Sequence, residues 1–96
     1  MPHFCFCSVI IENKSSHNDK KAIISAKFSN KGNFILSGGE DGLLNIWNPG
    51  SCELIGGFQA HSDRINEIVF SDCGRLFATC SEDESVKIWK IPDELI

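Results

Sequence analysis

The chain has 96 residues, enough for one small domain or for part of a larger one. Its 42% hydrophobic and 23% charged residues are typical of a globular protein rather than of a disordered tail. The 13 acidic and 9 basic residues give a net charge of −4, which argues against a nucleic-acid-binding module. The longest apolar run, residues 4–11, is too short to cross a bilayer and makes a poor signal peptide. We therefore expect an intracellular protein, cytoplasmic or nuclear, that binds neither nucleic acid nor membrane.

The main feature of the sequence is an internal repeat with an offset of 42 residues. Residues 23–47 align with residues 65–89 without a gap, and eight of the 25 aligned positions are identical. The identical pairs are Ile23/Ile65, Phe28/Phe70, Ser29/Ser71, Gly32/Gly74, Glu40/Glu82, Asp41/Asp83, Ile46/Ile88 and Trp47/Trp89. Such a repeat indicates a supersecondary unit that stacks on copies of itself.

Each copy of the repeat predicts three short strands joined by tight turns. The predicted strands cover residues 23–28, 33–38 and 43–47 in the first copy, and residues 65–70, 75–80 and 85–90 in the second. Gly32 and Gly74 stand in the first turn of each copy, where a hairpin requires a positive φ.

A turn and a fourth strand separate the two copies. Asn48, Pro49 and Gly50 predict a turn with proline at its second position and glycine at its third. A strand over residues 52–58 follows this turn and precedes the second copy. Residues 6–11 occupy the same place before the first copy, so the order of four strands occurs twice.

The second strand of each copy is apolar on both faces. Residues 34–36 and 76–78 are continuous apolar runs rather than alternating patterns. A strand of this kind needs cover on both sides of its sheet, and a stack of antiparallel blades provides it. We therefore predict an all-β fold of two four-stranded antiparallel blades of propeller type.

These residues resemble the WD-repeat family over residues 17–91. The shared pattern is a histidine, a strand ending in Phe-Ser, a turn glycine, a strand ending in Ser/Thr-x-x-x-Asp, and a tryptophan six residues later. The second copy carries it at His61, Phe70, Ser71, Gly74, Thr79, Asp83 and Trp89. The first copy carries Ser37, Asp41 and Trp47. Its candidate histidine, His17, lies 24 residues before Asp41, whereas His61 lies 22 before Asp83.

The resemblance implies an incomplete propeller, similar to a fragment of a longer one. Residues 1–16 would supply the last strand of a preceding blade and a loop, and residues 92–96 would be a tail. The first WD-type repeat would cover residues 17–58 and the second residues 59–91. Two repeats alone cannot close a ring of four or more blades.

The resemblance also implies a structural tetrad in the second repeat. The Trp89 indole would donate to Thr79, Thr79 would contact His61, and His61 would contact Asp83. Ser37, Asp41 and Trp47 would be the counterparts in the first repeat. Such a network gives a buried indole N–H and a buried carboxylate their partners. Because the hydroxyl is committed to the indole, we expect no hydrolase chemistry and no enzyme.

Propellers of the family typically act as rigid platforms for other proteins. The implied function is a non-catalytic interaction or scaffold module that needs no cofactor and binds protein partners of unknown identity. The candidate partner-binding residues are Ser62, Asp63, Arg64, Glu40 and Glu82. Self-association and further repeats of a parent chain are both open. The alternative is a truncated WD-repeat product with no independent binding activity.

The five cysteines, at positions 5, 7, 52, 73 and 80, are odd in number and irregularly spaced. This arrangement predicts reduced thiols in a reducing compartment. Cys5 and Cys7 lie near His3, but no second ligand pair exists elsewhere in the sequence. We therefore expect structural cysteines and no metal site.

Overall fold

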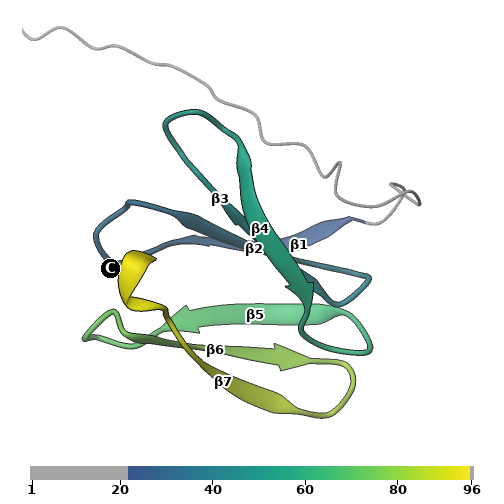
Figure 1. Ribbon diagram of the computed structural model, residues 1–96. Coiled ribbons are helices and arrows are strands. Elements are labelled where there is room, and N and C mark those ends of the chain that lie inside the picture. The colour runs from purple at the N-terminus through teal and green to yellow at the C-terminus, as the bar shows by residue number, and fades with distance from the viewer. Residues whose placement is uncertain (1–21, 96) are drawn as a thin grey trace, which may run out of the picture.

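The computed structural model describes residues 22–95 of the chain. These residues form two antiparallel β-sheets that are stacked face to face (Figure 1). The first sheet has the order β1 (Ile23–Phe28), β2 (Ile35–Gly39), β3 (Leu43–Trp47) and β4 (Leu54–Gln59). The second has the order β5 (Ile65–Phe70), β6 (Leu76–Ser81) and β7 (Val86–Lys90). A 3-10 turn, η1 (Asp93–Leu95), follows. The predicted all-β class is confirmed, and seven of the predicted strands are present within two residues of their predicted starts.

Among residues 22–95, the second sheet contains three of the four strands that the sequence predicts for each blade. The strand between the two copies, β4, pairs with β3 and completes the first sheet. Within residues 22–95, β7 pairs with β6 alone, so the second sheet has three strands. The physical reason is that β4 follows β3 through a short turn, and a short turn returns the chain to the strand just left. The predicted strand over residues 6–11 lies outside the described residues.

The backbone conformation matches the prediction at two turn glycines and differs from it at a third. Gly32 and Gly74 adopt φ values of 75° and 74°, as predicted. Gly50 does not adopt a positive φ, and the left-handed residue of that turn is Cys52, with φ of 63°. The Asn48 side chain explains the difference, because its Oδ1 accepts the Gly50 N–H at 2.8 Å. The turn then closes through the Cys52 N–H, which donates to the Asn48 carbonyl at 2.7 Å.

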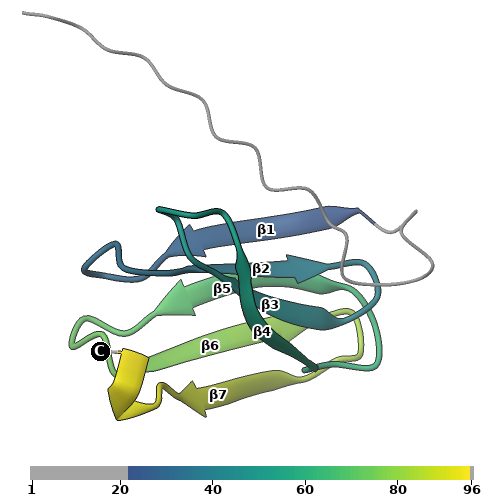
Figure 2. The ribbon, with the colours of Figure 1, turned by 45° about the horizontal axis from the view of Figure 1, so that its top comes forward.

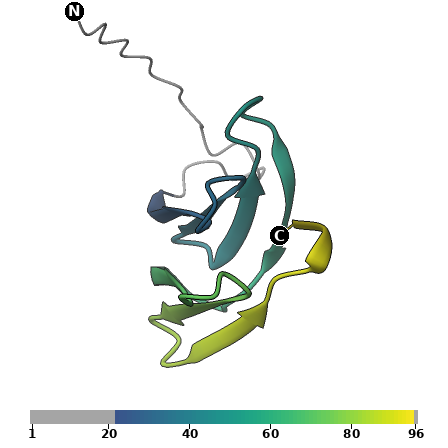
Figure 3. The same cartoon turned by 90° about the vertical axis from the view of Figure 1, so that its left-hand side faces the viewer.

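The hydrophobic core lies between the two sheets. Leu36 and Leu44 of the first sheet and Ile65 and Ile68 of the second are at most 1% exposed. Beyond them, the T-shaped pair of Phe34 and Phe70 joins the two sheets, with ring centroids 6.0 Å apart. Seen from the side, the sheets form two layers, and β4 runs from the first layer toward the second (Figure 3). The burial of these apolar side chains is the main contribution to the stability of the contact between the two sheets.

The connections gather at two opposite edges of the stack (Figures 1 and 2). The connections after β2, β4 and β6, residues 40–42, 60–64 and 82–85, lie together at one edge, which we call the loop edge. The connections after β1 and β5 lie at the opposite edge, next to η1. The loop edge carries most of the residues that the sequence singled out.

Candidate functional site

A chain of hydrogen bonds joins Trp89, Thr79, His61 and Asp83 at the loop-edge end of the second sheet. The Trp89 Nε1–H donates to Thr79 Oγ1 at 3.0 Å. Thr79 Oγ1 lies 2.6 Å from His61 Nε2, and His61 Nδ1 lies 2.9 Å from Asp83 Oδ2. The strands β6 and β7 position Thr79 and Trp89, while His61 follows β4 of the other sheet. The structure therefore brings together four residues that lie up to 28 positions apart in the sequence.

The chemistry of the four groups determines which group donates and which accepts in each hydrogen bond. An indole N–H can only donate, so Thr79 accepts from Trp89 and directs its own proton to His61 Nε2. The imidazole proton then sits on Nδ1 and is donated to Asp83. His61 and Thr79 are 2% and 1% exposed, so this network is closed to solvent at its centre.

Asp83 accepts further hydrogen bonds from its own turn. Its Oδ1 accepts the Ser85 N–H at 3.0 Å and the Ser85 hydroxyl, and its Oδ2 accepts the Ser62 N–H at 3.2 Å. The Ser85 hydroxyl bond, followed by the bond from His61, holds the pKa of the Asp83 carboxyl well below its usual range. Ser85 was not among the residues predicted from the sequence, although a serine two residues after an aspartate commonly bonds to it locally.

The first repeat carries a shorter version of this network. The Trp47 Nε1–H donates to Ser37 Oγ at 2.8 Å, and both side chains are buried. Asp41 Oδ1 accepts the Leu43 N–H at 3.1 Å, the counterpart of the bond from Ser85 to Asp83. The candidate histidine of this repeat, His17, lies outside the described residues.

The five candidate partner-binding residues all lie exposed at the loop edge. They are Ser62, Asp63 and Arg64 after β4, Glu40 after β2, and Glu82 after β6. Backbone bonds order the connections, because the Glu82 N–H donates to the Arg64 carbonyl at 3.0 Å and the Glu40 N–H to the Ala22 carbonyl at 3.0 Å. The three connections thus form one ordered, solvent-facing border beside the tetrad.

Gln59 also orders the loop edge, although it was not among the residues predicted from the sequence. Its Nε2 donates to the carbonyls of Asp41, at 2.6 Å, and His61, at 2.7 Å. It therefore ties the connection after β2 to the connection after β4. No sequence signal marks this glutamine, because its role depends on two backbone carbonyls that only the fold brings together.

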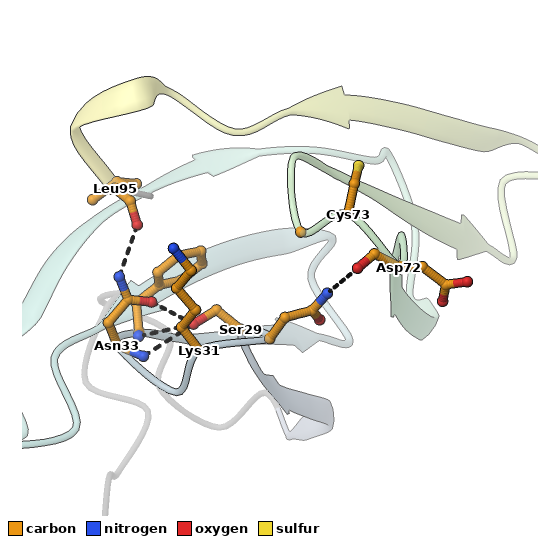
Figure 4. Close-up of a pocket in the computed structure, with 9 residues that line it drawn as sticks. Ser29, Lys31, Asn33, Asp72, Cys73 and Leu95 are labelled. Carbon is orange, nitrogen blue, oxygen red and sulfur yellow. Dashed lines mark hydrogen bonds between the residues drawn. The ribbon is translucent and has the colours of Figure 1, made fainter.

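A small cavity of about 170 Å³ lies at the opposite edge, between the turns after β1 and β5 (Figure 4). Two asparagine side chains of its wall are bonded across the cavity. Asn33 Nδ2 donates to the Leu95 carbonyl at 3.0 Å, and Asn30 Nδ2 donates to the carbonyls of Ser71 and Asp72. These bonds tie the turn of the first repeat to the turn of the second and to η1, so the cavity lies along the seam between the two repeats.

A second cavity, of about 330 Å³, opens between the sheets. Its walls are almost entirely apolar and come from β2, β3, β4, β6, β7 and the residues after β7. The lining residues are Phe34, Leu36, Ile46, Phe58, Phe77, Trp89, Lys90, Ile91, Pro92 and Leu95. Such a surface lacks the cluster of polar groups that catalysis requires.

The described residues offer no metal site and no membrane span. Among residues 22–95, no group of three or more His, Cys, Asp or Glu side chains could hold a metal ion. Over the same range, none of the elements is a helix long and apolar enough to cross a membrane. Cys52, Cys73 and Cys80 are free thiols, whereas His3, Cys5 and Cys7 lie outside the described residues.

The sequence pattern of the family described as "WD domain, G-beta repeat" matches residues 9–48 and 52–90 of the chain. Among curated proteins, Polyadenylation factor subunit 2 of Candida albicans is 33% identical over 67 residues, which are 70% of this chain and 12% of that protein. DDB1- and CUL4-associated factor 13 of Dictyostelium discoideum is 34% identical over 59 residues, 62% of this chain and 13% of that protein. The chain thus spans about an eighth of the length of these curated relatives.

The fold is also similar to solved propellers. The β-propeller domain of Cps50 (Swd1) from Myceliophteria thermophila matches with a TM-score of 0.76 and 21% identity. The match covers 79% of this chain and 23% of that chain. Together with the two matched repeats and the antiparallel sheets, this shows that the chain belongs to the WD-repeat family and has the fold of propeller blades.

Proposed function

We propose that the chain is a non-catalytic protein–protein interaction module of scaffold type, and that its loop edge contacts the partner. Proteins of the WD-repeat family generally mediate contacts between proteins and generally have no catalysis of their own. The observation that carries the proposal is the contrast at the loop edge. The ordered connections expose five polar or charged residues: Ser62, Asp63, Arg64, Glu40 and Glu82. In contrast, the His61 and Thr79 side chains of the neighbouring tetrad are buried.

The tetrad supports a structural role rather than an enzymatic one. The Thr79 hydroxyl is 1% exposed and bonded on both sides, to Trp89 and to His61. A nucleophile must instead reach a substrate, with a base free to take its proton. The tetrad contributes to function by holding the loop edge in place, because the Ser62 N–H donates to Asp83.

Within the loop edge, Arg64 is the residue we expect to contribute most to binding. Arginine is enriched among residues that dominate the energetics of protein interfaces. Arg64 is exposed, and its backbone is held by the Asp63 carboxylate at 2.7 Å and by the bond from Glu82. A fixed backbone reduces the conformational entropy that binding costs.

The partners are other proteins in an intracellular compartment, cytoplasmic or nuclear. The alternative predicted from the sequence, a truncated product without binding activity, is less favoured. Residues 22–95 form two hydrogen-bonded sheets around a shared core, and the buried side-chain polar atoms among them all have hydrogen-bond partners. A folded surface of this kind is what a binding module requires.

The test compares a loop-edge variant with a charge-matched variant at the opposite edge. The first carries Asp63→Ala, Arg64→Ala and Glu82→Ala, and the control carries Asp72→Ala, Arg75→Ala and Glu94→Ala, all at exposed positions. Each tagged protein is produced in its native cells, and the proteins that co-purify with it are quantified by mass spectrometry.

We expect the loop-edge variant to lose partners that the wild type and the control retain. If all three proteins retained the same partners in equal amounts, the loop edge would not be the binding surface. Circular dichroism of both variants checks that the two sheets are still folded.

A further inference from the structure

One face of the second sheet is apolar and open to solvent in the folded chain. This outer face, on the side of β5, β6 and β7 turned away from the first sheet, consists of Val69, Leu76, Ala78, Cys80, Val86 and Ile88, and Lys90 borders it opposite Leu76. The strand register places Val69, Ala78 and Ile88 in one row and Cys80 with Val86 in another. Val69 is 57% exposed, Val86 69% and Ile88 72%. A contiguous apolar surface of this kind indicates an interaction site.

The internal repeat shows what such a face binds. The residues 42 positions before the outer face are Lys27, Phe34, Leu36, Gly38, Leu44 and Ile46. In the first sheet these residues face the second sheet, and Phe34, Leu36 and Leu44 are at most 3% exposed. The same surface of the repeat is therefore buried in one copy and exposed in the other. Its cover in the first copy is the opposite face of a neighbouring repeat.

The chain also carries the complementary surface. Ile65, Ile68, Phe70 and Phe77 cover the first sheet, and their counterparts 42 positions earlier are Ile23, Ala26, Phe28 and Ile35. Phe70 packs against Phe34 with ring centroids 6.0 Å apart, whereas its counterpart Phe28 is 62% exposed. The two sheets contact each other through two complementary surfaces of the repeat. One molecule therefore also has an unoccupied copy of each surface: the outer face of the second sheet and the Phe28 side of the first.

We propose that the outer face binds the Phe28 side of the first sheet of a second copy of this chain, so that copies associate head to tail. Phe28 of one copy then lies on Leu76 of the next, as Phe70 lies on Phe34 within the chain. This contact uses a surface separate from the loop edge and does not depend on the proposed function. Such a heterologous contact closes into a ring or extends into a filament, according to the rotation between copies.

The contact between copies cannot repeat the internal contact in every detail. A Cβ atom added at Gly38 would lie 2.7 Å from Ile65 Cγ2, so this glycine allows the two sheets to approach closely. The counterpart of this pair between copies is Cys80 with Ile23, and a cysteine has the Cβ that glycine lacks. The sheets of two copies must therefore sit slightly farther apart at this point than the two sheets of one chain.

The test uses two variants that each block one half of the contact. Ile88→Glu places a charge on the outer face, and Phe28→Glu places one on the opposite side of the stack. Both positions are well exposed, so neither change removes core packing. Ser51→Glu, at an exposed position in the turn between β3 and β4, adds the same charge outside both strand faces and is the control.

Sedimentation velocity of the purified chain across the micromolar range gives the readout. We expect the wild type and Ser51→Glu to exceed the monomer mass of 10.6 kDa, and each face variant alone to sediment as a monomer. An equimolar mixture of the two face variants should form a dimer and nothing larger, because one intact half remains on each.

Three results would overturn the proposal. The first is a monomeric wild type throughout the range, and the second is association that persists in both face variants. The third is a mixture of Ile88→Glu and Phe28→Glu that stays monomeric while the wild type associates. None of these results bears on binding at the loop edge, because both face variants leave that edge intact.

Discussion

His61 and Asp83 join the two sheets at the loop edge through an Nδ1···Oδ2 distance of 2.9 Å. His61 lies in the connection between β4 of the first sheet and β5 of the second, whereas Asp83 lies in the β6–β7 turn of the second sheet. The bond therefore fixes the chain between the sheets against the sheet that follows. It also places the exposed residues 62–64 at a defined position beside the tetrad.

Thr79 is the central member of the tetrad, so removing its hydroxyl should have the clearest effect. Thr79→Val keeps the shape but leaves the Trp89 indole and His61 Nε2 without their partner. An unsatisfied buried polar group costs about 1–3 kcal/mol, so we expect a loss of that size in the free energy of unfolding. Urea denaturation measures it, and Thr79→Ser should remain close to the wild type. A valine variant as stable as the serine variant would contradict the network.

Asp83 should matter more for stability than Asp41. In the described part of the chain, Asp83 accepts bonds from His61, Ser62 and Ser85, whereas the counterpart Asp41 accepts from Leu43. We therefore expect Asp83→Ala to lower the denaturant midpoint more than Asp41→Ala does. Equal losses would mean that the two repeats hold their aspartates equally well.

The stability of the fold should decrease in acid because of Asp83. The pKa of its carboxyl is lower in the folded chain than the ordinary value of 3.8, mainly through the Ser85 hydroxyl and then His61. A lowered folded pKa stabilises the fold above the unfolded pKa, and this contribution disappears as the pH falls below 3.8 toward the folded pKa. Urea unfolding at a series of pH values should show this loss, and Asp83→Asn should reduce the slope. An unchanged slope in the variant would assign the acid sensitivity to other carboxyls.

Glu84 occupies a conformation that favours glycine. Its φ is 71°, and its counterpart in the first repeat is Gly42, with φ of 79°. Glu84→Gly should therefore stabilise the fold by up to about 1 kcal/mol, since left-handed backbone costs a side-chain-bearing residue about 1–2 kcal/mol. Thermal unfolding compares it with Glu82→Gly, at an exposed position without a positive φ, which should destabilise. The same sign of effect in both variants would refute the backbone argument.

Cys73 should be the fastest-reacting cysteine among the three that the structure describes. It is exposed, while Cys52 and Cys80 are half-buried. The Ser71 hydroxyl, 3.3 Å from Cys73 Sγ, lowers the pKa of this thiol, with a further contribution from the Arg75 backbone. Timed alkylation followed by peptide mass spectrometry should label Cys73 first, and Ser71→Ala should slow its labelling. Faster labelling of Cys80 would show that its strand opens readily.

The sequence determined much of the architecture through the repeat. Strand order, the positive φ at Gly32 and Gly74, and the class of fold follow from spacing and turn chemistry, which are local properties. The resemblance to WD repeats also implied the bond from Trp89 to Thr79, two residues that stand ten positions apart on consecutive strands of one hairpin. These features depend on residues that lie close together in the sequence, so they can be predicted without knowledge of the tertiary structure.

Only the tertiary structure decided the features that depend on which surfaces meet. The sequence could not tell that β4 completes the first sheet and leaves the second with three strands among residues 22–95. It also hid the role of Gln59, which bonds to two carbonyls from different connections. Phe28 and Phe70 are the same residue at equivalent repeat positions, yet one is exposed and the other packs between the sheets. Their difference arises because burial depends on the neighbouring sheet, which the residue itself does not specify.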